Sequence, residues 1–336
     1  MKYFLSLLSL VLLSACSNES LLKEANYNGY AQGTTFHISY LYQGEDISNM
    51  QSKLDAKFRE IDLALSTYVD NSEISRLNRG EEVSISPIFK AVHEKSIEVW
   101  KESGAYFDPT VGKLVRFWGF GPDARRAVDT ADVDSIKNYI GLDKLSSIRS
   151  KWSIPKGMEL DYNAIAQGYS VDLICEMLMK EGIKNYMVEV GGEVRCLGQN
   201  LEGKAWRIGV DKPTEEIDAQ DRFQFILGMD SMALATSGNY RKFWVDTATG
   251  MRYAHTINTK TGYPAKNQLL SASVLAPTCM EADAYATAFM SMGLKKTLLF
   301  LRNPPLPLEA YLIYSEEGKD EWQVWQSEGF EKLVLN

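Results

Sequence analysis

Two segments of the chain, 50–65 and 87–103, carry apolar residues at every third or fourth position, which is the spacing of one face of an α-helix. The predicted helices cover residues 50–65, 87–103, 164–180 and the stretch between 278 and 293. The last of these has the clearest ends. Thr278 can cap it, Glu281 stands at the partner position of a capping box, and Gly293 stands where a helix stops.

Other segments alternate or run apolar over four to eight residues, which predicts β-strands. These strands are predicted at 33–40, 186–190, 194–197, 206–210, 223–229, 271–275 and 310–315. The pair Gly191-Gly192 between two of them indicates a hairpin or a sharp bend. Helices and strands mix without a regular β-α-β alternation, so the pattern favours an α+β fold over a Rossmann sheet.

The N-terminus has the pattern of an export signal. Lys2 precedes an apolar run over residues 3–13, which is too short to span a membrane, and a small-residue pair stands directly before Cys16. This is typical of a bacterial lipoprotein, with Cys16 as the lipidated, palmitate-bearing first residue. The alternative is an ordinary secretory signal with a chance cysteine. The predicted organisation is a signal peptide at 1–15, a lipidated tether at 16–28 and a folded domain at 29–336.

Composition narrows the class of protein. The formal net charge is −8, and an acidic chain is a poor nucleic-acid binder. A hydrophobic content of 45% in a chain of this length can fill the core of one large domain or of two intimately associated lobes. Besides Cys16 the chain has Cys175, Cys196 and Cys279, an odd number without a C-x-x-C pair, so a disulfide framework or a zinc site is not expected.

The fourth predicted helix carries a candidate metal site. Asp283 and Thr287 are four residues apart, so their side chains point the same way, and the alanines around them leave room for a pyrophosphate. Oxygen ligands of this kind suit Mg²⁺, which takes one or two carboxylates plus substrate phosphates. In the alternative, which the spacing alone favours, Asp283 faces water and Thr287 hydrogen-bonds its own i−4 carbonyl.

Histidine is rare in this chain, and one of the three residues has a candidate role. His255 enters a Gly-Pro turn at 261–264, where it could act as a base or orient a phosphate; a lone histidine is more often structural. His37 is expected to be an ordinary strand residue, and His93 is expected on the solvated flank of the second predicted helix.

Two further segments are suited to an anion. Residues 236–241 bring hydroxyls, a glycine and an arginine together, as in a loop around an anion, although an ordinary polar turn has the same composition. Residues 161–169 open a helix whose free amides favour phosphate, unless Asp161 simply caps that helix. Aromatic side chains at Tyr68 and in the Tyr106-Phe107 pair could stack on a planar heterocycle, or could belong to the core.

Taken in order, eight short segments resemble the ApbE family of FAD:protein FMN transferases, which attach FMN covalently to a threonine of exported redox subunits. The resemblance runs from about residue 33 to residue 293. The matching segments are 33–35, 66–68 with 72–78, 107–112, 164–169, 190–193, 237–240, His255 with 261–264, and 276–278 with 280–284. Any one of them could arise by chance, whereas eight in the same order are specific.

The resemblance implies an α+β fold with mainly antiparallel sheets and packed helices in two intimately associated lobes. It implies a Mg²⁺ site made by the Ala164 carbonyl, the Asp283 carboxylate and Thr287. It also implies FAD contacts, at Tyr68, Tyr106, Phe107, Asp108, Gln167 and Ile257.

Four residues depart from the family pattern. Gln32 replaces a methionine, and Gln167 replaces a lysine whose charge would pair with FAD phosphate or carboxyl groups. Asn163 replaces a glycine, and Asn258 replaces an aspartate near His255. We therefore expect weaker FAD affinity than in relatives that have the lysine, with the metal pair intact.

The resemblance implies that metal-bound FAD is attacked at its FMN phosphorus by an acceptor threonine while AMP leaves. His255 is the candidate to accept the threonine proton or to hold the phosphate, and Asp283 could share that role. Two alternatives are FAD hydrolysis to FMN and AMP and a flavin-binding lipoprotein without catalysis. The expected acceptor is a subunit of a sodium-pumping quinone reductase or a related electron-transfer complex. Cys16 predicts a lipid anchor that faces the periplasm, and the inner membrane is the expected location. Ser17 stands where an aspartate would specify the inner membrane, so the outer membrane is the alternative.

Overall fold

The computed structural model describes residues 21–121, 130–149, 151–212, 222–239, 243–245, 252–316 and 321–335. Its centre is an eight-stranded sheet in the order β1-β2-β5-β6-β9-β12-β13-β14, and every neighbouring pair is antiparallel. Its strands are β1 (Lys23–Ala31), β2 (Thr34–Tyr42), β5 (Tyr186–Val190), β6 (Glu193–Leu197), β9 (Met232–Gly238), β12 (Leu269–Ala276), β13 (Glu309–Tyr314) and β14 (Gln323–Gln326). The predicted α+β class with mainly antiparallel sheets is confirmed.

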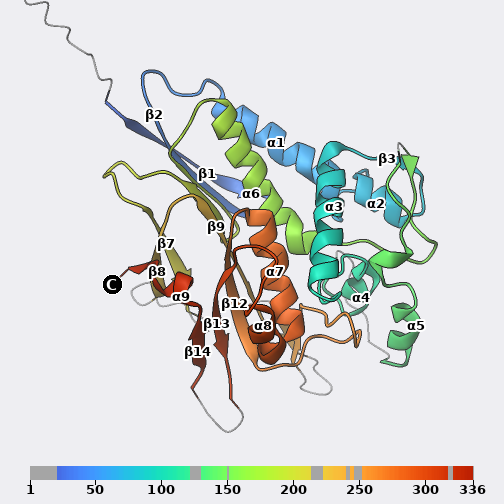
Figure 1. Cartoon of the computed structure of the whole chain (residues 1–336). Coiled ribbons are helices and arrows are strands. Elements are labelled where there is room, and N and C mark those ends of the chain that lie inside the picture. Colours follow the sequence, from blue (N-terminus) through green and yellow to red (C-terminus); the bar gives the residue numbers. More distant parts are fainter. Residues whose placement is uncertain are drawn as a thin grey trace, which may run out of the picture.

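Helices cover one face of this sheet, and a small sheet lies on the other face (Figure 1). The longer helices are α1 (Met50–Leu65), α3 (Pro87–Glu102), α6 (Asn163–Lys180) and α7 (Cys279–Met292). The shorter ones are α2 (Glu73–Asn78), α4 (Gly112–Phe117), α5 (Val133–Lys137), α8 (Leu294–Phe300) and α9 (Glu328–Glu331). The small sheet has the order β15-β8-β7, with β7 (Trp206–Asp211), β8 (Phe223–Met229) and β15 (Val334–Leu335). Short pairs are β3 (Val83–Ser84) with β4 (Lys151–Trp152) and β10 (Phe243–Val245) with β11 (Arg252–Ala254).

Helix α1 forms where its apolar spacing predicts it. Met50, Leu54, Phe58 and Ile61 are buried on one side of it, because residues three or four apart share a helix face. Helix α7 is different, since ten of its fourteen residues are buried. It lies between the large sheet and the helices α3, α6 and α8, and its alanines allow that close packing. Within the described residues, no helix combines the length and apolar character needed to cross a bilayer.

Two sequence predictions about the strands need correction, and a third is confirmed. Strand β1 begins at Lys23, inside the predicted 16–28 tether, so the folded domain starts before residue 29. Residues 236–238 of the predicted anion loop are the end of strand β9, paired with β12; residues 240–241 lie outside the described part of the chain. The hairpin at Gly191-Gly192 is confirmed, and both glycines have the positive φ that such a turn needs.

His93 is buried rather than solvated, with 3% of its surface exposed. Its Nδ1 atom lies 2.8 Å from the Tyr162 hydroxyl, and its ring packs against Trp152 with 5.0 Å between the ring centroids. Burial lowers the pKa of His93 from 6.5 to about 4, because the charged ring would lose its hydration. The neutral histidine therefore belongs to the core between α3 and α6.

This shift predicts a pH dependence of stability. The unfolded chain protonates His93 near its ordinary pKa, whereas the folded chain does so only near pH 4, so stability is complete above about pH 6.5 and falls toward pH 4. The contribution is up to about 3 kcal/mol. Urea unfolding of the wild type and of His93→Gln, at about pH 7 and about pH 4.5, should show a smaller pH-dependent loss for the variant. Equal losses in the two proteins would contradict this origin.

Candidate active site

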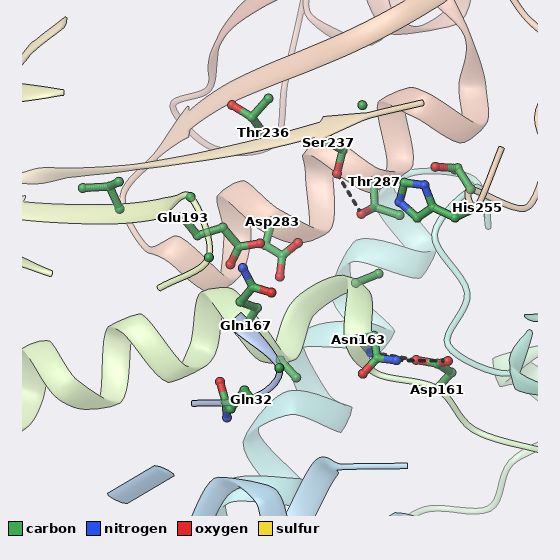
Figure 2. Close-up of a pocket in the computed structure, with 18 of the residues that line it drawn as sticks. Gln32, Asp161, Asn163, Gln167, Glu193, Thr236, Ser237, His255, Asp283 and Thr287 are labelled. Carbon is green, nitrogen blue, oxygen red and sulfur yellow. Dashed lines mark hydrogen bonds between the residues drawn. The ribbon is translucent and has the colours of Figure 1, made fainter. Parts of the chain in front are cut away.

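A cleft of about 1660 Å³ opens between the helices and the two sheets. Its walls come from segments far apart in the sequence, including the β1–β2 turn, the start of α6, the middle of α7 and the segment after β11 (Figure 2). All ten predicted metal, FAD and catalytic residues line it: Tyr68, Tyr106, Phe107, Asp108, Ala164, Gln167, His255, Ile257, Asp283 and Thr287. The fold thus brings the predicted residues together, while their individual roles stay predictions. Cys16, the predicted lipidation site, lies outside the described residues.

Asp283 and Thr287 lie on the cleft side of α7, as their spacing predicts. Only 4% of Asp283 is exposed, and its Oδ2 atom accepts a hydrogen bond of 3.1 Å from the Gly168 amide. The Thr287 hydroxyl lies 3.3 Å from that of Ser237 on β9. The alternative that Asp283 faces water is therefore wrong. A carboxylate this deeply buried needs compensating partners, which makes it a candidate for cation binding.

Helices α6 and α7 approach closely at Gly168. A Cβ atom there would lie 2.3 Å from the Cys279 carbonyl oxygen and 2.9 Å from the Asp283 Cβ, so only glycine fits. In a regular helix the Gly168 amide would donate to the Ala164 carbonyl, and here the Asp283 carboxylate competes for that amide. Ala164 and Asp283 both line the cleft, on either side of this close contact between the two helices.

These oxygen atoms fit Mg²⁺ better than a transition metal. Within the described residues, no three His, Cys, Asp or Glu side chains gather in a metal-binding cluster. One carboxylate, one hydroxyl and one carbonyl make a hard-oxygen donor set that leaves positions for water or a substrate phosphate, as Mg²⁺ prefers. Asp283, Thr287 and Ala164 could therefore hold a magnesium ion that also binds a pyrophosphate.

His255 follows strand β11 and lies across the cleft from α6 (Figure 2). Its ring is 6.4 Å from that of Phe120, centroid to centroid. The next residues turn sharply, because the Asn258 side chain accepts hydrogen bonds from the amides of Lys260 (3.0 Å) and Thr261 (3.1 Å). Both amides donate to the single Oδ1 atom of Asn258, and its Nδ2 atom donates to the Ser291 carbonyl at 3.3 Å. Ile257 is buried beneath this turn, with 6% of its surface exposed.

The loop before α4 forms the aromatic wall of the cleft. Asp108 holds this loop, since its Oδ1 atom accepts from the Thr110 hydroxyl at 2.6 Å and its Oδ2 atom accepts from the Trp100 indole at 2.9 Å. Burial raises the pKa of Asp108, and these hydrogen bonds partly offset the rise. Two lysines flank Tyr106, with the Lys296 ammonium 4.5 Å and the Lys260 ammonium 5.5 Å from its ring centroid. These contacts hold the loop and the Tyr106 ring in place beside the cleft.

The remaining predicted contacts lie near the turns that enter the cleft. The Gln167 amide group donates to the Val190 carbonyl at 2.9 Å, so this side chain is tied to the β5–β6 turn. Gln32 sits in the left-handed region at φ 53 and hydrogen-bonds Asp62. Asp161 accepts from the Asn163 amide at 2.8 Å, so the first amide of α6 is already bonded. Tyr68 is 64% exposed at the rim, open to a ligand.

Sequence reasoning missed the wall that the small sheet contributes. Arg207, Asp211 and Arg222 line the cleft from β7 and the start of β8, and the guanidinium of Arg222 bonds both carboxylate oxygens of Asp211, at 2.7 and 3.2 Å. Glu189 and Glu193 line it from the β5–β6 hairpin. These residues stand singly on separate strands and form no sequence motif. They can be recognised as cleft residues only once the order of the strands in the sheets is known.

Comparisons with known proteins identify the family of this chain. The family model of the ApbE family matches residues 32–312. The FAD:protein FMN transferase of Haemophilus influenzae is 35% identical over 300 residues, covering 85% of each chain, and that of Vibrio cholerae is 33% identical, covering 95% of this chain and 96% of the other.

Solved structures superpose along most of the chain. The flavin transferase ApbE from Vibrio cholerae matches with a TM-score of 0.81 at 33% identity, covering 93% of this chain and 99% of the other. The apo flavinyl transferase ApbE of Pseudomonas stutzeri matches with a TM-score of 0.81 at 27% identity, covering 93% and 97%. This chain therefore belongs to the ApbE family of transferases.

Proposed function

We propose that this protein transfers FMN from FAD to a threonine hydroxyl of an exported redox subunit and releases AMP, with Mg²⁺ as cofactor. The observation that carries the proposal is the buried Asp283 carboxylate beside Thr287, in a cleft that also holds every predicted FAD contact. A cleft of about 1660 Å³ is large enough to enclose a dinucleotide and still admit a segment of an acceptor. The names of the relatives support the same reaction.

Different residues of the cleft would bind the metal ion and orient FAD. Asp283, Thr287 and the Ala164 carbonyl would hold Mg²⁺, which supplies positive charge to the pyrophosphate oxygens when bound. Tyr106 and Phe107 offer aromatic surface to the planar groups of FAD, and the bonded Asp108 keeps their loop in place. The buried position of Asp283 keeps water away from its carboxylate, which strengthens its attraction for a cation.

The transfer needs a proton acceptor. The threonine oxygen forms a bond to the FMN phosphorus, the bond from that phosphorus to the bridging oxygen breaks, and AMP leaves with the bridging oxygen. The threonine proton passes to a base in the cleft. His255 is the proposed base, since it lines the same cleft as Asp283 and an imidazole is suited to proton transfer near neutral pH.

The proposed partner is an acceptor subunit of a sodium-pumping quinone reductase or a related electron-transfer complex. The proposed location is the periplasmic face of the inner membrane, through a lipid on Cys16. Both proposals rest on the leader sequence and on the family resemblance.

The reaction can be tested by intact-protein mass spectrometry. The purified protein is incubated with FAD, Mg²⁺ and a candidate acceptor domain, with the same domain carrying valine at its target threonine as control. We expect a mass gain of one FMN on the acceptor only, and no gain when a chelator removes the metal. Free FMN and AMP without labelling would indicate FAD hydrolysis instead, and intact FAD would indicate a flavin-binding protein.

A further inference from the structure

Helix α6 is hydrogen-bonded to helix α7 at two points that lie one helical turn apart. At the first, the Gly168 amide donates to Asp283, as described above. At the second, the Asp172 carboxylate of α6 accepts hydrogen bonds from the backbone amides of Cys279 (3.0 Å) and Met280 (2.8 Å), the first two residues of α7. Positions four apart on each helix share one face, so both contacts lie along the same helix–helix interface.

The start of α7 is fully hydrogen-bonded as a result. Helices leave their first amides without intrahelical partners. Asp172 satisfies two of these amides, and the Thr278 hydroxyl accepts from the amide of Glu281 at 3.3 Å. The next amide, of Ala282, donates to the Thr278 carbonyl at 3.1 Å. This helix end is therefore occupied by a protein carboxylate and is not available to a phosphate, while the carboxylate charge suits the positive end of the helix dipole.

Asp172 is tied to the large sheet as well. The Arg195 guanidinium on β6 donates to its Oδ1 atom at 2.6 Å, and only 4% of Asp172 is exposed. A carboxylate buried this deeply is stable only with charged and hydrogen-bonding partners, and here it has one cation and two amides. Asp172 therefore links α6, α7 and β6, and its position fixes where α7 begins relative to α6.

We propose that Asp172, oriented by Arg195, is a positioning residue for the Mg²⁺ site. Asp283 lies on α7 one turn after the amides that Asp172 holds, and the Ala164 carbonyl lies on α6 two turns before Asp172. The distance between these two ligands is thus set by the α6–α7 contact. The inference rests on the proposed function, because it requires Mg²⁺ to bind there. Residues that orient metal ligands from outside the coordination sphere typically change metal affinity by about 10–100-fold when replaced.

The test measures Mg²⁺ binding directly. Mg²⁺ is titrated into the full chain with FAD and without acceptor, in a calorimeter, for the wild type and for Asp172→Asn. We expect the Kd for Mg²⁺ to rise by about ten-fold or more in the variant. We also expect faster amide hydrogen exchange in the first turn of α7, and a transfer rate that recovers at high Mg²⁺. Recovery by metal separates a positioning role from a general loss of structure.

Two further variants make the comparison specific. Leu227→Ala removes a fully buried side chain under the other face of the sheet, outside the cleft, and should lower stability with the Kd for Mg²⁺ unchanged within about two-fold. Arg195→Lys keeps the buried positive charge but loses the guanidinium geometry. It should also raise the Kd for Mg²⁺, but less than Asp172→Asn does. It provides the test if Asp172→Asn does not fold.

The outcomes are distinguishable. If the wild type binds Mg²⁺ and the folded variants of Asp172 and Arg195 bind it with the wild-type Kd, the positioning role is wrong and the proposed function stands. If the wild type takes up no Mg²⁺, the metal in the proposed function and this inference both fail.

Discussion

Replacing Asp283 by alanine is expected to lower the rate of FMN transfer by about 10³-fold or more, because a metal that stabilises phosphoryl charge contributes several kcal/mol to the transition state. The side chain is the buried carboxylate of the proposed magnesium site and accepts the Gly168 amide. Its loss removes the charged ligand and the hydrogen bond that links α7 to the Gly168 amide of α6. Transfer is measured as the initial rate of FMN incorporation into the acceptor.

Two variants separate lost charge from lost structure. Asp283→Asn keeps the shape and one acceptor oxygen for Gly168, so it should fold like the wild type and still lose most activity. Glu176→Ala removes an exposed carboxylate from the C-terminal half of α6, remote from the cleft lining, and should leave the rate unchanged. An Asp283→Ala protein that labels the acceptor at the wild-type rate would refute the metal assignment.

Replacing Gly168 by alanine should have the second largest effect, on both stability and transfer. The added Cβ would lie 2.3 Å from the Cys279 carbonyl oxygen, a backbone atom that cannot move without shifting α7. Overpacking of this kind typically costs about 1–3 kcal/mol. We therefore expect a lower free energy of unfolding in urea, a weaker response of transfer to Mg²⁺, and a melting temperature that FAD and Mg²⁺ no longer raise as they do for the wild type.

Gly228→Ala is the matched control for this substitution. Gly228 lies in β8, and the nearest atoms to an added Cβ are the Leu335 side-chain carbons at 3.1 and 3.5 Å, which can adjust. The control should change stability little and leave the effect of Mg²⁺ on transfer intact. If Gly168→Ala behaves in the same way, the contact between α6 and α7 is not needed for the site.

The parts of the fold that could be predicted are those with a strong local signal. Helix α1 was predicted at its observed bounds because its apolar residues keep one spacing, and α7 was predicted from its cap and its terminal glycine. Strand β1 gave no signal, since it is a mostly exposed edge strand in which only Ala25 is buried. The sequence shows no alternation for strand β9, because the consecutive residues Ala233, Leu234 and Ala235 are all buried and so both faces of the strand are covered.

The same limit applies to the site. Asp283 and Thr287 could be predicted from their spacing on one helix, and the family motifs brought the other cleft residues into one group. The link from Asp172 to α7 joins residues 107 and 108 positions apart, and no local pattern announces such a contact. The burial of His93 could not be predicted, because a single polar residue on an amphipathic helix gives no sign of a hydroxyl partner such as Tyr162, which lies 69 positions away in the sequence.

The proposed lipid anchor at Cys16, together with the position of strand β1, would limit how far the cleft can lie from the membrane. A lipid on Cys16, as the leader predicts, would be joined to Lys23 by six residues, which extend at most about 22 Å. The nine residues of β1 add about 30 Å before the turn that lines the cleft. The cleft would then lie within about 50 Å of the bilayer surface, so an acceptor threonine would have to be presented close to the membrane and not far out in the periplasm.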